Sequence, residues 1–161
     1  MDPDNRRLVD FRRRADLLAS TATPEVLGQT FASNGTMDDR VKIALTARLL
    51  RFRREHPRLF IEGEYLPLAM AASGQEPGLF AFARRVGDEA CIAAARVHAL
   101  AGEEVSRSAE VWLPADMAGA WRSVLTGRRI ELVGVASRAA VPQGELVPDG
   151  QPCELLFRDN A

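Results

Sequence analysis

The chain has 161 residues, which is enough for one domain of ordinary size with its own hydrophobic core. Hydrophobic residues make up 47% and charged residues 27% of the chain, and these fractions exclude a disordered protein. The net charge is −1, but it is uneven: residues 1–60 carry 12 basic and 8 acidic side chains, and residues 61–161 carry 9 and 14.

A first helix is predicted over about residues 7–19. Its apolar face consists of Phe11, Ala15 and Leu18, which follow the helical period. Residues 20–36 are rich in Ser, Thr, Gly and Pro, which is typical of a linker, with room for one short helix opened by Pro24.

A second helix is predicted over about residues 38–55. The carboxylates of Asp38 and Asp39 can cap the start of this helix and stabilise the positive end of its dipole. Pro57 ends the helix, because the residue before a proline avoids the α region. Spacings of four, four and three place one apolar stripe on this helix: Val41, Leu45, Leu49 and Phe52. Arg48, Arg51 and Arg54 lie off the stripe, so we expect them to face solvent.

After residue 60 the pattern changes to short runs that are typical of strands. Six strands are predicted, at residues 79–83, 90–97, 109–113, 121–125, 130–133 and 153–157. Turn signals separate them at Ser73-Gly74, Gly87-Asp88, Ala101-Gly102, Thr126-Gly127, Gln143-Gly144 and Asp149-Gly150. Short strands at this spacing indicate an antiparallel sandwich. The expected fold class is therefore α+β, with a helical segment over residues 1–60 and a β-sandwich domain over residues 61–161.

The longest unbroken apolar run, residues 90–95, is far shorter than the about 20 residues of a membrane span. The first residues lack the apolar stretch of a secretory signal. Cys91 and Cys153 are too few for a disulfide framework, so we expect free thiols. These features predict a cytoplasmic protein without a membrane partner.

No metal or cofactor site is predicted. His56 and His98 are far apart in the sequence and have no cysteine at ligand spacing, whereas zinc needs three or four such ligands. The chain also lacks a phosphate-binding loop and a dinucleotide fingerprint. We therefore expect no metal and no cofactor.

Two carboxylates, Glu62 and Glu64, are two residues apart, so a strand would point both to one face. A retaining glycosidase needs two carboxyl groups about 5 Å apart, but a charged strand edge gives the same pattern and is the interpretation we favour. Trp112 and Trp121 could stack on sugars if exposed, although we expect them to fill the sandwich core.

The arginines of the second helix leave a nucleic-acid-binding function open as an alternative. A basic stripe could bind phosphates: Arg48, Arg51, Arg53, Arg54 and Arg58. Phe52 is the one aromatic residue among them and belongs to the apolar stripe, and no recognition-helix motif accompanies them. We therefore expect a solvated helix face and no nucleic-acid partner.

The opening residues carry the most specific pattern of the chain. Asp2-Pro3-Asp4-Asn5-Arg6-Arg7, followed by Val9-Asp10-Phe11, resembles a motif of the α-amylase superfamily, glycoside hydrolase family 13, and within it of the maltooligosyl trehalose synthases near their C-terminal end. Further matches follow in the same order at residues 42–45, 51–57, 59–60, 63–68, 80–84, 112–114 and 121–127. The resemblance covers nearly the whole chain, and the later matches look like that family's C-terminal β-domain.

The resemblance implies a particular reaction for the parent enzymes. They rearrange the reducing-end α-1,4 bond of a maltooligosaccharide into an α,α-1,1 bond, with a retaining mechanism that uses two carboxylates and no cofactor. The carboxylates of the family lie in an upstream (β/α)₈ barrel, and 161 residues are too few for a barrel of about 250. We therefore expect the C-terminal structural domain of such an isomerase, with no catalytic residues, inactive alone, and with that barrel as its partner.

The same resemblance implies that the opening motif borders the sugar cleft. On this basis the candidate contacts to a maltooligosaccharide are Asp2, Asp4, Asn5 and Arg6, although Leu8 stands where the family has proline.

Met1 directly before the motif indicates a truncated gene or a designed fragment. The helical segment is expected to expose apolar surface that faced the barrel, and a homodimer or a crystal contact is a candidate use of that surface. A carbohydrate-binding module remains a further alternative, although most of the ten aromatic residues are at core-like positions.

Overall fold

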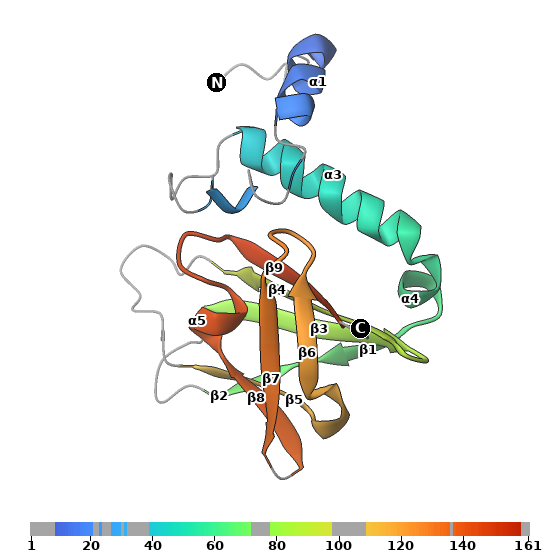
Figure 1. Ribbon diagram of the computed structural model, residues 1–161, viewed down its shortest axis with the longest axis vertical. Helices are drawn as coiled ribbons and strands as arrows, with labels where there is room; N and C mark the ends of the chain where they lie inside the picture. Colours follow the sequence, from blue (N-terminus) through green and yellow to red (C-terminus); the bar gives the residue numbers. More distant parts are fainter. Residues whose placement is uncertain are drawn as a thin grey trace, which may run out of the picture.

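The computed structural model describes residues 9–20, 23, 27–29, 31, 39–71, 78–97, 109–135 and 137–158. The helices whose bounds are described before the sheet are α1 (Phe11–Ser20), α3 (Asp39–Glu55) and α4 (Pro57–Ile61). The strands are β1 (Glu64–Pro67), β2 (Ala69–Ala71), β3 (Leu79–Val86), β4 (Glu89–Arg96), β5 (Glu110–Pro114), β6 (Gly119–Ser123), β7 (Arg129–Val135), β8 (Arg138–Pro142) and β9 (Cys153–Arg158). A 3₁₀ turn, η1 (Ala115–Met117), and a single helical turn, α5 (Gln143–Leu146), interrupt them (Figure 1).

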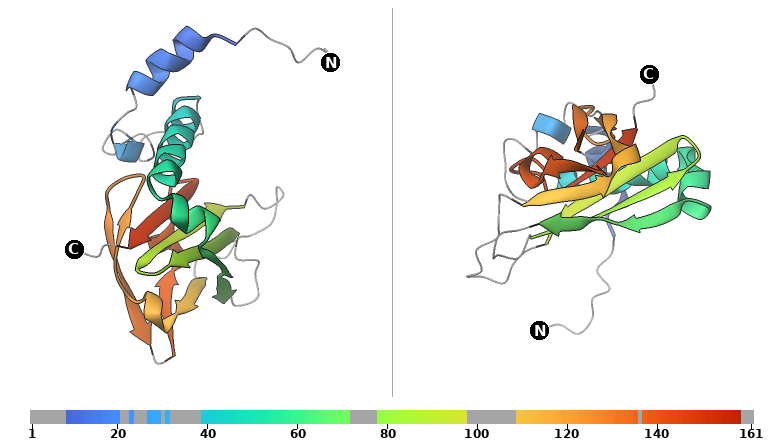
Figure 2. Two further views of the ribbon diagram at one scale, coloured as in Figure 1. Left: turned by 90° about the vertical axis from the view of Figure 1, so that its right-hand side faces the viewer. Right: turned by 90° about the horizontal axis from the view of Figure 1, so that it is seen from below.

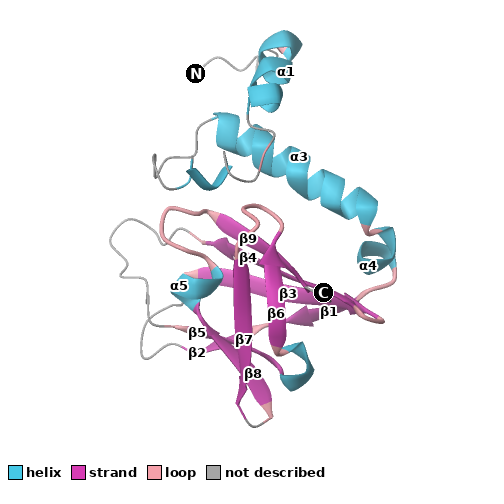
Figure 3. Ribbon diagram, in the orientation of Figure 1, coloured by secondary structure: helices cyan, strands magenta, loops and turns pink. Residues whose placement is uncertain are grey.

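The described strands form one antiparallel sheet that folds over on itself. Their order is β1-β3-β4-β9-β6-β7-β8-β5-β2. Strand β7 belongs to both layers, because residues 129–132 pair with β6 and residues 133–135 pair with β8. Figure 3 shows β7 as a long strand that runs from one layer into the other. The result is a sandwich that is nearly closed into a barrel, so the predicted α+β fold class is confirmed.

The main hydrophobic core lies between the two layers of the sandwich. Strand β3 shows the expected alternation at its start, because Leu79, Ala81 and Ala83 are buried and Phe80 is exposed. Trp121 is completely buried, and its indole N–H donates a hydrogen bond to the Met117 carbonyl at 3.0 Å. The prediction that Trp121 fills the core is confirmed.

The six predicted strands are all present, and three further strands, β1, β2 and β8, were not predicted. The Gly87-Asp88 signal is confirmed as the β3–β4 turn, where Gly87 takes a φ of +56°. The Gln143-Gly144 signal also separates two strands, because these residues begin the single turn α5 between β8 and β9, in which the Val147 N–H donates to the Gln143 carbonyl at 2.9 Å. The signals at Ser73-Gly74 and Ala101-Gly102 lie outside the described residues.

The two predicted helices are confirmed as α1 and α3. Helix α3 ends at Glu55, and Pro57 then occupies the first turn of α4, where a missing N–H costs nothing. Proline therefore ends one helix and begins the next. Asp38 lies outside the described residues, as do most residues of the predicted linker and its Pro24, although residues 27–29 and 31 are helical.

Helices α3 and α4 cover the outer face of the central strands (Figure 2). Strands β4 and β9 are apolar on both faces, since Ile92 and Leu156 enter the sandwich core while Cys91 and Leu155 point outward. Phe52 of α3 packs on the outward residues, with its ring 5.2 Å from that of Phe157. The apolar stripe of α3 is thus confirmed as a packing surface.

A second cluster holds the first half of α3 against the sheet. Val41 and Leu45 are buried there beside Leu125, which belongs to the turn between β6 and β7. The prediction that Arg48 faces solvent is wrong, because Arg48 is half-buried and its Nε donates to the Val124 carbonyl. Arg51 and Arg54 are exposed as predicted. The boundary between two domains at residue 60 stays a prediction.

The turn from α4 into β1 is fixed by a very close approach of the backbone. A Cβ at Gly63 would lie 2.1 Å from the Leu59 carbonyl oxygen, so only glycine fits. Arg84 of β3 closes this turn, because its guanidinium donates to the carbonyl of Phe60 at 2.9 Å and to that of Gly63 at 3.3 Å. These contacts set the position of β1 beside β3.

Both cysteines are free thiols, as predicted. Burial raises the pKa of Cys91 to about 11 and that of Cys153 to about 11, so neither is a reactive thiolate at neutral pH.

Within the described parts of the chain, no helix has both the length and the apolar composition needed to cross a membrane.

The packing of α3 predicts different effects for two neighbouring substitutions. Phe52→Ala removes a ring that is 95% buried among Leu59, Cys91 and Leu155, and we expect it to lower the free energy of unfolding by about 3–5 kcal/mol. Arg51→Ala, on the exposed side, should stay within about 0.5 kcal/mol of the wild type. Urea denaturation of both variants measures the difference. Equal midpoints would mean that α3 does not belong to the core of this chain.

Candidate functional site

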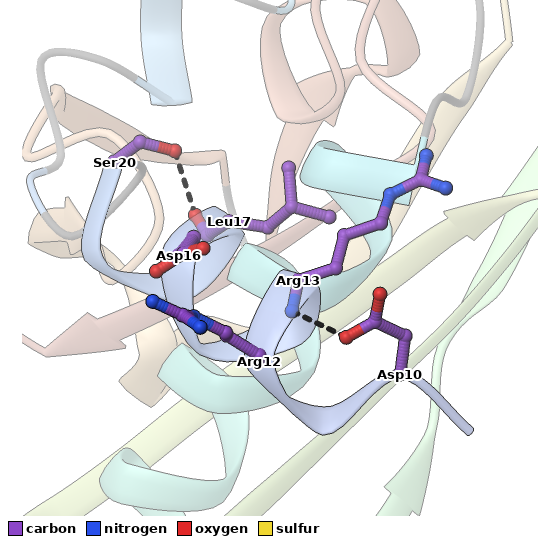
Figure 4. A pocket seen from close by; sticks show the side chains of 6 residues that line it. All are labelled: Asp10, Arg12, Arg13, Asp16, Leu17 and Ser20. Atoms are coloured by element: carbon purple, nitrogen blue, oxygen red, sulfur yellow. Dashed lines mark hydrogen bonds between the residues drawn. The ribbon is translucent and has the colours of Figure 1, made fainter.

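The four residues proposed from the opening motif, Asp2, Asp4, Asn5 and Arg6, lie outside the described residues, so their role as sugar contacts stays a prediction. Asp10, from the end of the same motif, has a defined structural role. Its Oδ1 accepts a hydrogen bond from the Arg13 N–H at 2.8 Å and caps the start of α1 (Figure 4).

Helix α1 rests on α3 and has no buried residue. Phe11 is 76% exposed, so the predicted apolar face is present but uncovered. A small depression of about 450 Å³ lies against α1, lined by Asp10, Arg12, Arg13, Asp16, Leu17 and Ser20 (Figure 4). An amphipathic helix of 10 residues is marginal without packing, so its open face suits a further partner.

An open groove of about 790 Å³ runs between α1 and α3. Leu17 and Leu18 line one wall, and Ile43, Ala47 and Leu50 line the other. The carboxylates beside it are engaged, since Asp10 caps α1 and Asp39 forms an ion pair with Arg13 at 3.7 Å. The groove therefore suits apolar docking and lacks a carboxylate pair for catalysis among its described residues.

The carboxylates Glu62 and Glu64 are not brought together as a catalytic pair. Glu62 follows α4 and pairs with Arg58 at 3.4 Å, whereas Glu64 begins β1 and pairs with Arg85 at 2.8 Å. Both side chains are exposed, and Arg85 also contacts Asp116 at 2.6 Å. Glu64 on the edge strand β1 matches the strand-edge interpretation, whereas Glu62 lies before the strand, and the two give no acid/base pair.

The histidines do not form a metal site in the described part of the chain. His56 lies between Phe52 and Phe157, and its Nδ1 is 3.4 Å from Oε1 of Glu89. His98 lies outside the described residues. Among the residues that are described, no group of three His, Cys, Asp or Glu side chains is placed to hold a metal ion.

A buried carboxylate, Glu154 of β9, organises the turn between β6 and β7. Its Oε1 accepts hydrogen bonds from Ser123 Oγ at 2.7 Å and from the Leu155 N–H at 2.9 Å. Ser123 Oγ in turn accepts from the Thr126 N–H and hydroxyl, both at 2.9 Å. Sequence patterns did not indicate this network, because its members come from two strands and a turn.

Burial raises the pKa of Glu154 above its ordinary value of 4.5, and this effect exceeds the opposing effects of Ser123, Leu155 and Arg128. Arg128 lies 3.6 Å from Oε2 of Glu154 but donates its closest hydrogen bond to the Glu145 carbonyl at 2.9 Å. The carboxylate side chain is fully inaccessible, so it cannot reach a substrate. Glu154 therefore has a structural role.

An aromatic strip lies on the outer face of β1 and β3, formed by Tyr65, Phe80 and Phe82. The ring centres of Tyr65 and Phe82 are 5.1 Å apart, and those of Phe82 and Phe80 are 5.9 Å apart. Tyr65 is 47% and Phe80 52% exposed. The sequence held a signal for this surface, because Phe80 and Phe82 are two residues apart and so share one face of a strand.

The prediction that Trp112 fills the core is wrong. Trp112 is half-buried on β5, and the guanidinium of Arg138 from the neighbouring strand β8 covers its ring at 3.9 Å. The register brings them together, since Trp112 pairs with Ala140 and Pro114 with Arg138. The arginine occupies a face on which a ligand ring could otherwise stack.

The raised pKa of Glu154 predicts how stability depends on pH. The folded state holds the proton more tightly than the unfolded state, so this group makes the protein less stable as the pH rises from about 4.5 through the folded pKa. Glu154→Gln cannot titrate, and the free energy of unfolding of this variant relative to the wild type should therefore increase from about pH 4 to pH 7. Urea denaturation across this range tests it, and parallel pH curves would contradict it.

Comparison with protein families found no family model that matches the chain. Two curated relatives, named as maltooligosyl trehalose synthases from Mycobacterium tuberculosis strains CDC 1551 and H37Rv, are each 32% identical over 161 residues. The alignment covers 100% of this chain and 17% of either relative. The chain therefore spans about a sixth of the length of the curated relatives it matches.

Two solved structures share the fold. An α-amylase from Geobacillus thermoleovorans, in complex with acarbose, matches 100% of this chain and 27% of its own, with a TM-score of 0.53 and 20% identity. An Anoxybacillus α-amylase matches 97% of this chain and 25% of its own, with a TM-score of 0.53 and 18% identity. The chain thus resembles a maltooligosyl trehalose synthase along its whole length, consistent with a C-terminal portion, and its fold occurs as part of α-amylases.

Proposed function

We propose that this chain is the C-terminal structural part of a bacterial maltooligosyl trehalose synthase. The observation that carries the proposal is the 32% identity along all 161 residues. The parent enzyme would be an isomerase that converts the reducing-end α-1,4 bond of a maltooligosaccharide into an α,α-1,1 bond. The order of the motifs from Asp2 to Gly127 supports a C-terminal position for this part.

The proposed role is structural because the described carboxylates that were candidates for chemistry have other roles. Glycoside rearrangement by a retaining route needs a nucleophile and an acid/base across one sugar cleft. Arginines form ion pairs with Glu62, Glu64 and Asp39. Asp10 caps α1, and Glu154 is buried. The catalytic pair would be supplied by an upstream (β/α)₈ barrel, and this chain would support that barrel.

The uncovered side of the helices is the proposed contact with the barrel. Phe11 and Leu50 are more than half exposed, and the groove between α1 and α3 is walled by aliphatic side chains. Such a surface is usually covered in the complete protein. A homodimer through the same surface is the competing arrangement. We also place the parent enzyme in the cytoplasm, and the free thiols Cys91 and Cys153 support this.

The first test of the proposal is an activity assay with maltopentaose. The isolated chain should neither hydrolyse nor rearrange it, because no nucleophile and acid/base pair can be assigned to it. The product of the reading frame that includes the upstream barrel should form a non-reducing trehalose end. Product chromatography of both reactions makes the comparison. Rearrangement by the isolated chain would overturn the structural role.

A second test addresses the docking surface through Phe11→Asp. In the isolated chain this exposed position should tolerate the change within about 0.5 kcal/mol, because the ring has little contact to lose. In the complete parent enzyme the same change should lower the melting temperature by several degrees, because a charge would be buried against the barrel. Arg12→Asp, on the same helix and also exposed, is the control for a general effect of charge. Equal melting temperatures for all three parent proteins would place the barrel contact elsewhere.

A further inference from the structure

We propose that the aromatic strip of Tyr65, Phe80 and Phe82 binds an α-1,4-linked glucan chain at a site outside the catalytic barrel. The exposed row of aromatic rings itself indicates a carbohydrate site. The choice of the α-1,4 linkage rests on the proposed function, because the parent enzyme would act on maltooligosaccharides. The site would hold a glucan near the enzyme without taking part in the chemistry.

The strip is a continuous surface built by two neighbouring strands. Tyr65 of β1 stands opposite Arg84 of β3, and Phe82 of β3 stands opposite Pro67 of β1. The contacts of 5.1 Å and 5.9 Å join the three rings into one row, with Phe82 in the middle. About half of each end ring is open to solvent. Aromatic side chains of this size are exposed at a cost unless a ligand covers them.

The register explains why the rings stay uncovered within the fold. Phe80 stands opposite Ala95 and Phe82 opposite Ala93 on β4, and a methyl group does not reach over a neighbouring ring. The apolar cluster under α3 and α4 consists of Phe52, Leu59, Cys91 and Leu155, and none of the three rings belongs to it. The strip therefore lies outside this cluster, on two strands of the sheet and not on a loop.

The make-up of the strip distinguishes a sugar from a protein partner. Its large exposed side chains are all aromatic, and glucose rings present flat C–H faces that stack on such rings. The Tyr65 hydroxyl at one end can donate to a sugar oxygen. The groove between α1 and α3, in contrast, has aliphatic walls of Leu17, Ile43 and Leu50 with charged rims, which suits a protein contact.

The tilt of the rings also fits a coiled glucan. The planes of Tyr65 and Phe82 differ by 31° and those of Phe82 and Phe80 by 52°, so the three rings do not form one flat platform. A coiled α-1,4 chain presents its glucose faces at different angles, whereas a β-1,4 chain forms a flat ribbon. Among the described residues no guanidinium lies over these three rings, unlike Trp112, which Arg138 covers.

Native gel electrophoresis with soluble polysaccharide in the gel tests the inference on the chain as it is. Amylopectin should retard the wild type, and hydroxyethyl cellulose at the same concentration should not. Tyr65→Ala and Phe80→Ala should each weaken the apparent affinity for amylopectin about tenfold. Phe11→Ala is the control, because it removes a ring that is even more exposed, at 76%, but lies on α1, and it should leave retardation unchanged.

Each outcome either supports or overturns glucan binding by the aromatic strip. Retardation that is lost in the two strip variants, with melting temperatures close to the wild type, supports it. Equal mobility of the wild type with and without amylopectin overturns it, as does unchanged retardation of Tyr65→Ala and Phe80→Ala. A shift of these variants in size-exclusion chromatography, without loss of retardation, would assign the strip to a protein contact instead. None of these results bears on the maltopentaose assay, which tests the proposed function separately.

Discussion

The two central strands β4 and β9 are apolar on both faces, and the rest of the architecture follows from the need to cover them. Ile92 and Leu156 require a second sheet layer on one side, while Cys91 and Leu155 require helices on the other. Strand β7 meets the first need by passing from one layer into the other, and the α3–α4 pair meets the second through Phe52 and Leu59. Helix α1 takes no part in this cover and rests on α3.

Sequence periodicity predicted the helices and strands that have one buried apolar face and one exposed face. Helix α3 and strand β3 were found from the sequence because buried and exposed residues alternate along them with the proper period. Strand β1 was missed since most of its residues are exposed, and β2 because it has three residues. Strand β8 is rich in alanine and ends in proline, both of which are uncommon in strands. Arg48 points away from the apolar stripe, yet its long side chain reaches the Val124 carbonyl, which only the fold could reveal.

The candidate sites differ in how far they could be predicted from the sequence. The family resemblance pointed to the opening motif, of which the structure describes Asp10 as a helix cap. The aromatic strip required the pairing of β1 with β3, because nothing in the sequence places Tyr65 beside Phe82. Likewise, Ser123 and Glu154 are 31 residues apart and meet only in the folded sheet. Alternation predicts which side of a strand a residue occupies, whereas register decides which residues meet.

The position of β9 couples the order of synthesis to the folding of this chain. Residues 153–158 insert between β4 and β6, so this inner strand of the sheet is synthesised after both of its neighbours. Until it arrives, β4 and β6 each present an open edge, and edges of this kind pair readily with other chains. A polypeptide that stopped before residue 153 would keep both edges exposed and would also lack the Glu154 side chain that holds Ser123. Premature termination would thus give an aggregation-prone product, and a cell's proteases and chaperones would meet nascent chains of this protein in that state.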